Sequence, residues 1–250
     1  MATYREMTSG AALPIIFAFT LPLLLGNLLQ QTYSMIDAAI VGQYLGINAL
    51  ASVGASTSVL FLIIGFCNGC CCGFAFPVAQ KFGARDYVTM RHLVNVSLRL
   101  AMLMSVLIAA ITSFFCYDIL HLMQTPENIF HDAYLYLLVT FIGIPCTFYY
   151  NLLSGIIRAL GDSKTPFYFL LFSTVLNIIL DLFCILVLGW GVLGAGVATV
   201  VSQGISAVLC YIYMMRRFTI LRKYSKKCTF YTLRFGCSFA AVNTIKPQLL

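Results

Sequence analysis

The chain has 250 residues, of which 61% are hydrophobic and 9% are charged, and its mean hydropathy is +0.93. Soluble globular domains carry about 25% charged residues, so this composition excludes that class and indicates an integral membrane protein. The net charge of +7 comes from Lys and Arg that gather in particular connections. We interpret it as a signal of membrane orientation and expect no nucleic-acid partner.

Six apolar stretches are long enough to cross about 30 Å of hydrocarbon, which takes roughly 20 residues in a helix. They are residues 13–37, 48–79, 93–116, 133–157, 166–188 and 193–215. Strands of a membrane barrel would instead be about ten residues long and would alternate in polarity. The sequence therefore predicts an all-α membrane protein with six transmembrane helices.

All Lys and Arg residues can be placed on one side of such a bundle. They precede the first span, separate the second from the third and the fourth from the fifth, or follow the sixth, and Arg99 lies near the same end of its span. The connections on the other side contain no Lys or Arg. By the positive-inside rule, both termini are cytoplasmic, and we expect the basic segment 216–227 to rest against anionic lipid headgroups.

Polar side chains follow one face of four of these helices, with the spacing of three and four residues that a helix requires. In the first and fourth spans they are Thr20, Asn27, Gln30, Gln31, Ser34 and Asp37, and Thr140, Thr147, Asn151, Ser154 and Arg158. In the fifth and sixth spans they are Ser173, Thr174, Asn177 and Asp181, and Thr199, Ser202, Gln203 and Ser206. Ser and Thr can bond to their own helix, but lipid satisfies none of these groups. We therefore expect the four faces to line a water-filled cavity.

Two acids, Asp37 and Asp181, lie in or at the end of these apolar stretches. An Asp at the centre of a membrane helix costs about 2.5–3.5 kcal/mol on insertion scales, so such a residue usually faces a cavity and has a function. Counted from the cytoplasmic ends, both acids and Thr199 reach the outer part of the membrane. We expect them to form one site that exchanges a proton or holds a small cation. The alternative for Asp37 is that it caps an interfacial helix end.

Two prolines within the spans predict bends, because proline removes a backbone hydrogen bond and clashes with the preceding turn. Pro22 predicts a kink in the first span, with Asp37 beyond it, and Pro145 is a second candidate hinge.

Motifs for enzymatic or metal chemistry are not convincing in this sequence. The cysteines at 67 and 70–72 lie within an apolar span, so we interpret them as small packing residues and predict no metal site. The glycine pattern at 189–194 joins two spans without the strand and acidic residue of a dinucleotide-binding unit. We therefore predict that the chain is not an enzyme.

Several segments resemble, in order, the MATE (multidrug and toxic compound extrusion) family of the MOP superfamily. They are residues 35–51, 80–86, 158–166, 177–181 and 189–199, within a resemblance that covers about residues 10–217. The resemblance implies secondary active efflux of cationic or amphipathic organic compounds or drugs by antiport with H+ or Na+. No other cofactor is expected, and the implied location is a bacterial plasma (inner) membrane.

The resemblance also implies the roles of particular residues. The cation- or proton-coupling site of the family carries over to Asp37, Asn177, Asp181 and Thr199, and its helix bend carries over to Pro22. From the polar faces we further expect cavity-lining roles for Asn27, Gln30, Gln31, Ser34, Thr147, Asn151 and Gln203.

The chain departs from the family in its length. MATE proteins have two six-helix lobes with a cavity between them, and residues 1–217 correspond to the N-terminal lobe alone. Residues 218–250 are a basic tail without another clear span, which suggests a truncated or frameshifted reading frame. A full transporter would then need a second six-helix lobe, from the missing half or from another copy. The alternatives are a lipid-linked oligosaccharide flippase of the same superfamily, a membrane-embedded enzyme and a non-transporting fragment.

Overall fold

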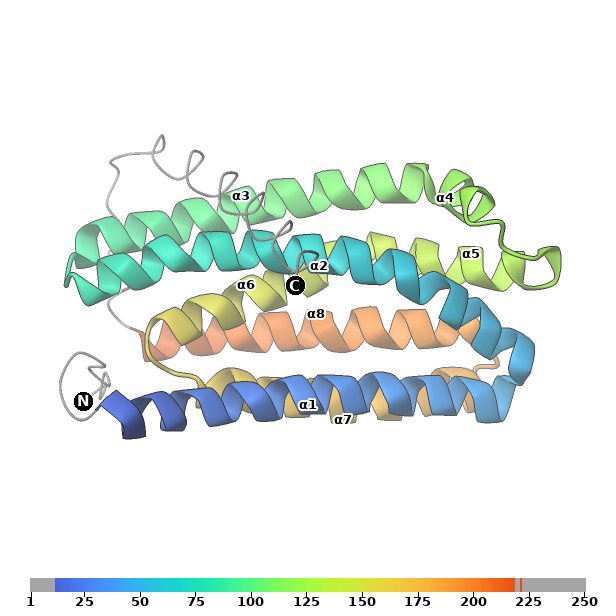
Figure 1. Ribbon diagram of the computed structural model, residues 1–250, viewed down its shortest axis with the longest axis horizontal. Helices are drawn as coiled ribbons and strands as arrows, with labels where there is room; N and C mark the ends of the chain where they lie inside the picture. The colour runs from blue at the N-terminus through green and yellow to red at the C-terminus, as the bar shows by residue number, and fades with distance from the viewer. Residues whose placement is uncertain (1–11, 219–220, 222–250) are drawn as a thin grey trace.

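The computed structural model describes residues 12–218 and 221, which form a bundle of long helices (Figure 1). The elements are α1 (Ala12–Leu45), α2 (Ile47–Gly83), α3 (Tyr87–Phe114), α4 (Cys116–Leu122), α5 (Glu127–Ile142), α6 (Ile144–Ala159), α7 (Lys164–Leu182), the π-helical turn η1 (Phe183–Val187) and α8 (Gly191–Arg217). Apart from Phe218 and Leu221, the tail expected at 218–250 lies outside the described residues.

The helices cover the predicted spans, except that α3 ends at Phe114 and η1 ends at Val187, shortly before the predicted ends at 116 and 188. Four of them, α2, α3, α7 with η1, and α8, are each long and apolar enough to cross a membrane, and α5 and α6 together form a fifth, bent span. The helix α1 has 34 residues and runs along the bundle beside α7, as the first predicted span requires (Figure 1). Many large apolar side chains of these helices are exposed, which suits a surface in contact with lipid.

The connections alternate between the two ends of the bundle, as the charge pattern predicts. The described start of α1, the α2–α3 and α6–α7 connections and the end of α8 lie at one end (Figure 1). The α1–α2, α3–α5 and α7–α8 connections lie at the opposite end. The Lys and Arg residues of the described connections lie at the first end, which we infer from the positive-inside rule to be the cytoplasmic end.

The predicted fourth span, residues 133–157, is a broken helix. The α5 and α6 helices meet at Gly143 with a bend of 47°, and Pro145 occupies the first turn of α6. The bend predicted near Pro145 is thereby confirmed. Gly143 also lets α8 approach closely, because a Cβ at this position would overlap Val200 Cγ2 and lie 2.9 Å from Val200 Cγ1.

Two local features were not predicted from the sequence. The connection between the third and fourth spans contains the short helix α4. The outer end of α7 continues as the π-helical turn η1 directly after Asp181, an irregularity that is often found at functional sites.

The interior of the bundle is formed mainly around α6 and α8. Helix α6 packs against α2, α3 and α8, and helix α8 packs against α5, α6 and α7. Cys67, Cys70 and Cys71 are buried in this core, as expected for small apolar residues. A smaller apolar cluster around Val41 and Ile185 lies near the outer acids.

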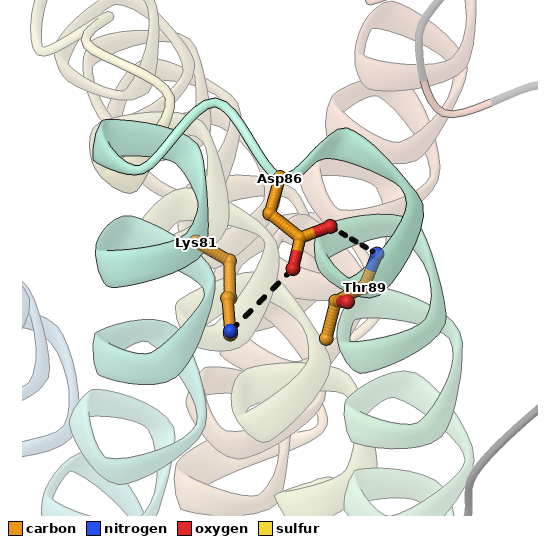
Figure 2. Close-up of polar contacts among 3 residues, drawn as sticks. All are labelled: Lys81, Asp86 and Thr89. Atoms are coloured by element: carbon orange, nitrogen blue, oxygen red, sulfur yellow. Dashed lines mark hydrogen bonds and ion pairs between the residues drawn. The ribbon is translucent and has the colours of Figure 1, made fainter.

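The α2–α3 turn is held by polar contacts at the cytoplasmic end (Figure 2). Asp86 caps α3, since its Oδ1 accepts a hydrogen bond from the Thr89 backbone N at 3.2 Å, and its Oδ2 lies 3.4 Å from Lys81 Nζ. The hydrogen bonds from Thr89, together with Lys81, hold the pKa of Asp86 below its usual value. This turn includes Arg85, whose φ of 57° is unusual for a residue other than glycine.

Candidate functional site: a polar cavity with two buried acids

A cavity of about 830 Å³ lies within the bundle, bounded by side chains of α1, α2, α5, α6, α7 and α8. Its size suits a drug-sized organic molecule, for which pockets measure about 300–1,000 Å³. The structure places all seven residues expected as polar lining on this cavity: Asn27, Gln30, Gln31, Ser34, Thr147, Asn151 and Gln203. The polar faces of α1, α6 and α8 therefore converge on one space.

The two acids of the expected coupling site meet at the outer part of this cavity. Asp37 lines the cavity with 8% of its surface exposed, whereas Asp181 is fully buried behind it. Their carboxyl groups lie close enough to interact directly. The α1 helix continues from Asp37 to Leu45, so the alternative that Asp37 caps a helix end is wrong.

Asn177 and Thr199 join the acids in one hydrogen-bonded group. Asn177 lies one turn before Asp181 on α7, and its Nδ2 donates to Asp181 Oδ2 at 2.8 Å when the amide is oriented to satisfy both of its ends. In that orientation Asn177 Oδ1 accepts from the Thr199 backbone N at 3.1 Å. All four residues expected at the coupling site are therefore neighbours, although they come from α1, α7 and α8.

Two tyrosines belong to the same group and were missed by the sequence analysis. Tyr33 OH lies 3.1 Å from Thr199 Oγ1, and Tyr136 is close enough to both acids to interact with them electrostatically. Tyr33 precedes Asp37 by one helical turn, so its position on the polar face of α1 was a usable signal. Tyr136 on α5 lies one helical turn before Thr140, the first residue of the predicted polar face of this span, so the same signal was available.

The site can hold a small hard ion or a proton. It offers carboxylate, amide and hydroxyl oxygens, which are the groups preferred by Na+-like and other hard cations. Asp37 Oδ1 and Asp181 Oδ1 have no hydrogen-bond partner among the described residues, and each can accept a proton or contact a cation.

The opposite end of the cavity is shaped by α1, α6 and α7. Pro22 lines it, but α1 passes through Pro22 as one continuous helix, so the kink expected there does not interrupt the helix. Arg158, in the last turn of α6, is the single Lys or Arg among the described residues that line the cavity. The cavity thus has an acid toward its outer end and a cation at its cytoplasmic end.

The sequence matches the MatE family model over residues 22–183. It is 36% identical over 205 residues to "Probable multidrug resistance protein YoeA" of Bacillus subtilis, a match that covers 80% of this chain and 44% of that protein. It is 34% identical over 211 residues to "Probable multidrug resistance protein YpnP" of the same organism, covering 84% of this chain and 47% of that protein.

Solved structures match the same fold. The crystal structure of MATE in complex with MaL6 superposes with a TM-score of 0.85 at 25% identity, covering 97% of this chain and 55% of that one. An outward-facing MATE family transporter of the MOP superfamily superposes with a TM-score of 0.82 at 26% identity, covering 92% and 52%. The chain spans about half the length of these relatives, which corresponds to one lobe. On its family model, its relatives and its fold, the chain belongs to the MATE family of multidrug efflux transporters.

Proposed function

We propose that this chain is the ion-coupling lobe of a secondary active exporter that exchanges cationic or amphipathic organic compounds for H+ or Na+. The observation that carries this proposal is the pair of acids, Asp37 and Asp181, in contact at the outer part of a drug-sized polar cavity. Relatives named as multidrug resistance and multidrug export proteins support the class of substrate.

Coupling requires that the ion and the substrate compete for one conformational equilibrium, so the ion must bind one state more tightly than the other. A proton or Na+ from the outside binds Asp37 and Asp181 and neutralises part of their charge. The helix α1 then bends or straightens at Pro22, which lines the same cavity, and this movement expels the substrate. Asn177 orients Asp181 through its hydrogen bond, and Thr199, which bonds to both Asn177 and Tyr33, holds Asn177 in place.

We propose that transport needs a second six-helix lobe, from another segment or another copy, and that the protein works in a bacterial inner membrane. The oligosaccharide-flippase alternative is less well supported. A pyrophosphate-linked lipid calls for several cationic side chains, and Arg158 is the single one on the described part of the cavity wall.

Ion binding by this lobe is tested with the purified full chain in detergent. Thermal unfolding is measured at increasing Na+ concentration, with K+ replaced by Na+ so that the ionic strength stays constant. A separate series measures it at increasing H+ concentration. Saturation at about 100 times the Kd adds about 2.7 kcal/mol, or roughly 5–11 °C in Tm for a chain of this size. We expect such a shift for at least one ion.

Asp37→Asn and Asp181→Asn should each remove the ion-dependent shift, whereas exposed Asp118→Asn should leave it intact. The same variants are then compared for dye efflux from vesicles that contain the chain with a second MATE lobe. Undiminished ion-driven stabilisation and efflux in both acid variants would refute the assignment.

A further inference from the structure

Arg158 is half-buried and lines the cytoplasmic end of the cavity, where the proposed efflux mechanism has no use for a cation. Its Nε donates to the Ser154 backbone O at 3.1 Å, so the side chain folds back along α6 rather than extending past the end of the helix. The guanidinium is close enough to Cys71 of α2 and Cys210 of α8 to interact with them electrostatically. The Arg158 side chain therefore lines the cavity at a point near α2 and α8.

The remaining hydrogen-bond donors of Arg158 have no acidic partner in the described part of the chain. The neighbouring acid, Asp162, instead accepts from the Thr165 backbone N at 3.0 Å, from Thr165 Oγ1 at 2.6 Å and from Tyr213 OH at 3.2 Å. A guanidinium has five N–H donors, and the bond to Ser154 uses one of them. The two terminal nitrogens are thus available to a ligand in the cavity.

A second polar group lies beside Arg158. Ser154 lines the cavity, and only 3% of its surface is exposed. Tyr150 and Cys210 lie near it, but Ser154 Oγ meets the geometric criteria for a hydrogen bond with none of the described residues. Phe167 and Leu170 of α7 also line the cavity and supply an apolar wall. A fork of N–H donors, a hydroxyl and an apolar wall together fit a carboxylate on an aromatic or aliphatic body.

We infer that Arg158 and Ser154 form an anion subsite at the cytoplasmic end of the cavity, which receives the carboxylate of an amphipathic compound. This inference rests on the proposed transport function. It extends the proposed substrates from organic cations to zwitterions. The positive part of such a compound faces the outer end of the cavity, where Asp37 lies. Because one guanidinium is present on the described wall, the subsite suits a single carboxylate.

The test uses two forms of one rhodamine dye that differ only at the carboxyl group, the free acid and its ethyl ester. Binding of each dye to the purified full chain in uncharged detergent is measured by fluorescence anisotropy. We expect the free acid to bind more tightly, by about tenfold, which is typical of a charge-assisted hydrogen bond. Arg158→Gln should reduce this preference to near unity, and Arg158→Lys should restore part of it.

Exposed Arg216→Gln removes the same charge from the same end of the bundle and is the matched control. It should leave the preference unchanged. Asp37→Asn should weaken the binding of both dyes by the same factor, whereas Arg158→Gln should weaken the binding of the free acid alone. Loss of the coupling site and loss of the anion subsite therefore change the two affinities differently. If the unmodified chain prefers the free acid but shows no stabilisation by Na+ or H+, the coupling proposal alone is overturned.

The inference is overturned if the unmodified chain binds the ester as tightly as the acid, if it binds neither dye, or if Arg158→Gln leaves the preference in place. A phospholipid headgroup has related chemistry, so the assay is repeated with added phosphatidylglycerol. Displacement of the free acid by this lipid at an equimolar level would assign the subsite to a headgroup and also overturn the inference.

Discussion

The close approach of α8 to the α5–α6 break gives a sharp structural prediction. Gly143 has φ and ψ of −78° and −9°, which alanine adopts without strain, so the effect of Gly143→Ala should come from sterics alone. The new Cβ would overlap Val200 Cγ2 and lie 3.0 Å from Val200 Cβ. Valine has few alternative χ1 rotamers, and α8 must therefore move or Val200 must leave its preferred rotamer.

Overpacking of this kind typically costs about 1–3 kcal/mol. For a chain of this size, the Tm should fall by roughly 2–12 °C. Unfolding can be followed with a thiol-reactive fluorogenic dye, because Cys67, Cys70 and Cys71 are buried and become reactive when the bundle opens. The Val200→Ala change removes the two nearest atoms, so the double variant should recover most of the lost stability.

Gly54→Ala is the matched control, since no atom lies within 4 Å of a Cβ at Gly54 in α2. It should raise the stability slightly, by about 0.5–1 kcal/mol, because alanine favours the helix. A Gly143→Ala variant whose Tm equals or exceeds that of the unmodified chain would show that the α5–α6 break is not closely packed against α8. Failure of Val200→Ala to restore the Tm would show that the contact with α8 is not the cause.

Two further predictions concern the cytoplasmic connections. Asp86→Asn should lower the Tm modestly at neutral pH, where Asp86 is ionised in both the folded and the unfolded chain. The Tm difference from the unmodified chain should begin to shrink only below about pH 4, the usual pKa of Asp, and should vanish once the pH falls through the lowered pKa of the folded state. A Tm difference that stays constant over this pH range in thermal melts would contradict this. Thr165→Val should increase proteolysis of the α6–α7 connection, because Thr165 bonds to both Asp162 and Tyr213; unchanged cleavage relative to Thr89→Val would disprove that role.

Much of the candidate site follows from helical spacing alone. Asp37 stands out because a carboxylate in an apolar stretch needs a polar surrounding, and one polar face of α1 leads to it. The same reasoning selects Asp181 with Asn177 one turn earlier. Tyr136 shares a helix face with Thr140, so spacing placed it toward the cavity, but only the packing of α5 against its neighbours brings it near the acids.

The sequence by itself determined the class of protein, the spans and their orientation, because the length of an apolar run and the side on which Lys and Arg gather are properties of the chain read alone. Only the tertiary structure decided that Asp37 faces the cavity while Asp181 lies buried behind it, that Gly143 admits α8, and that Arg158 lines the cavity. These features depend on how far each helix is rotated about its axis and how closely it approaches its neighbours. Packing between helices distant in sequence determines both quantities.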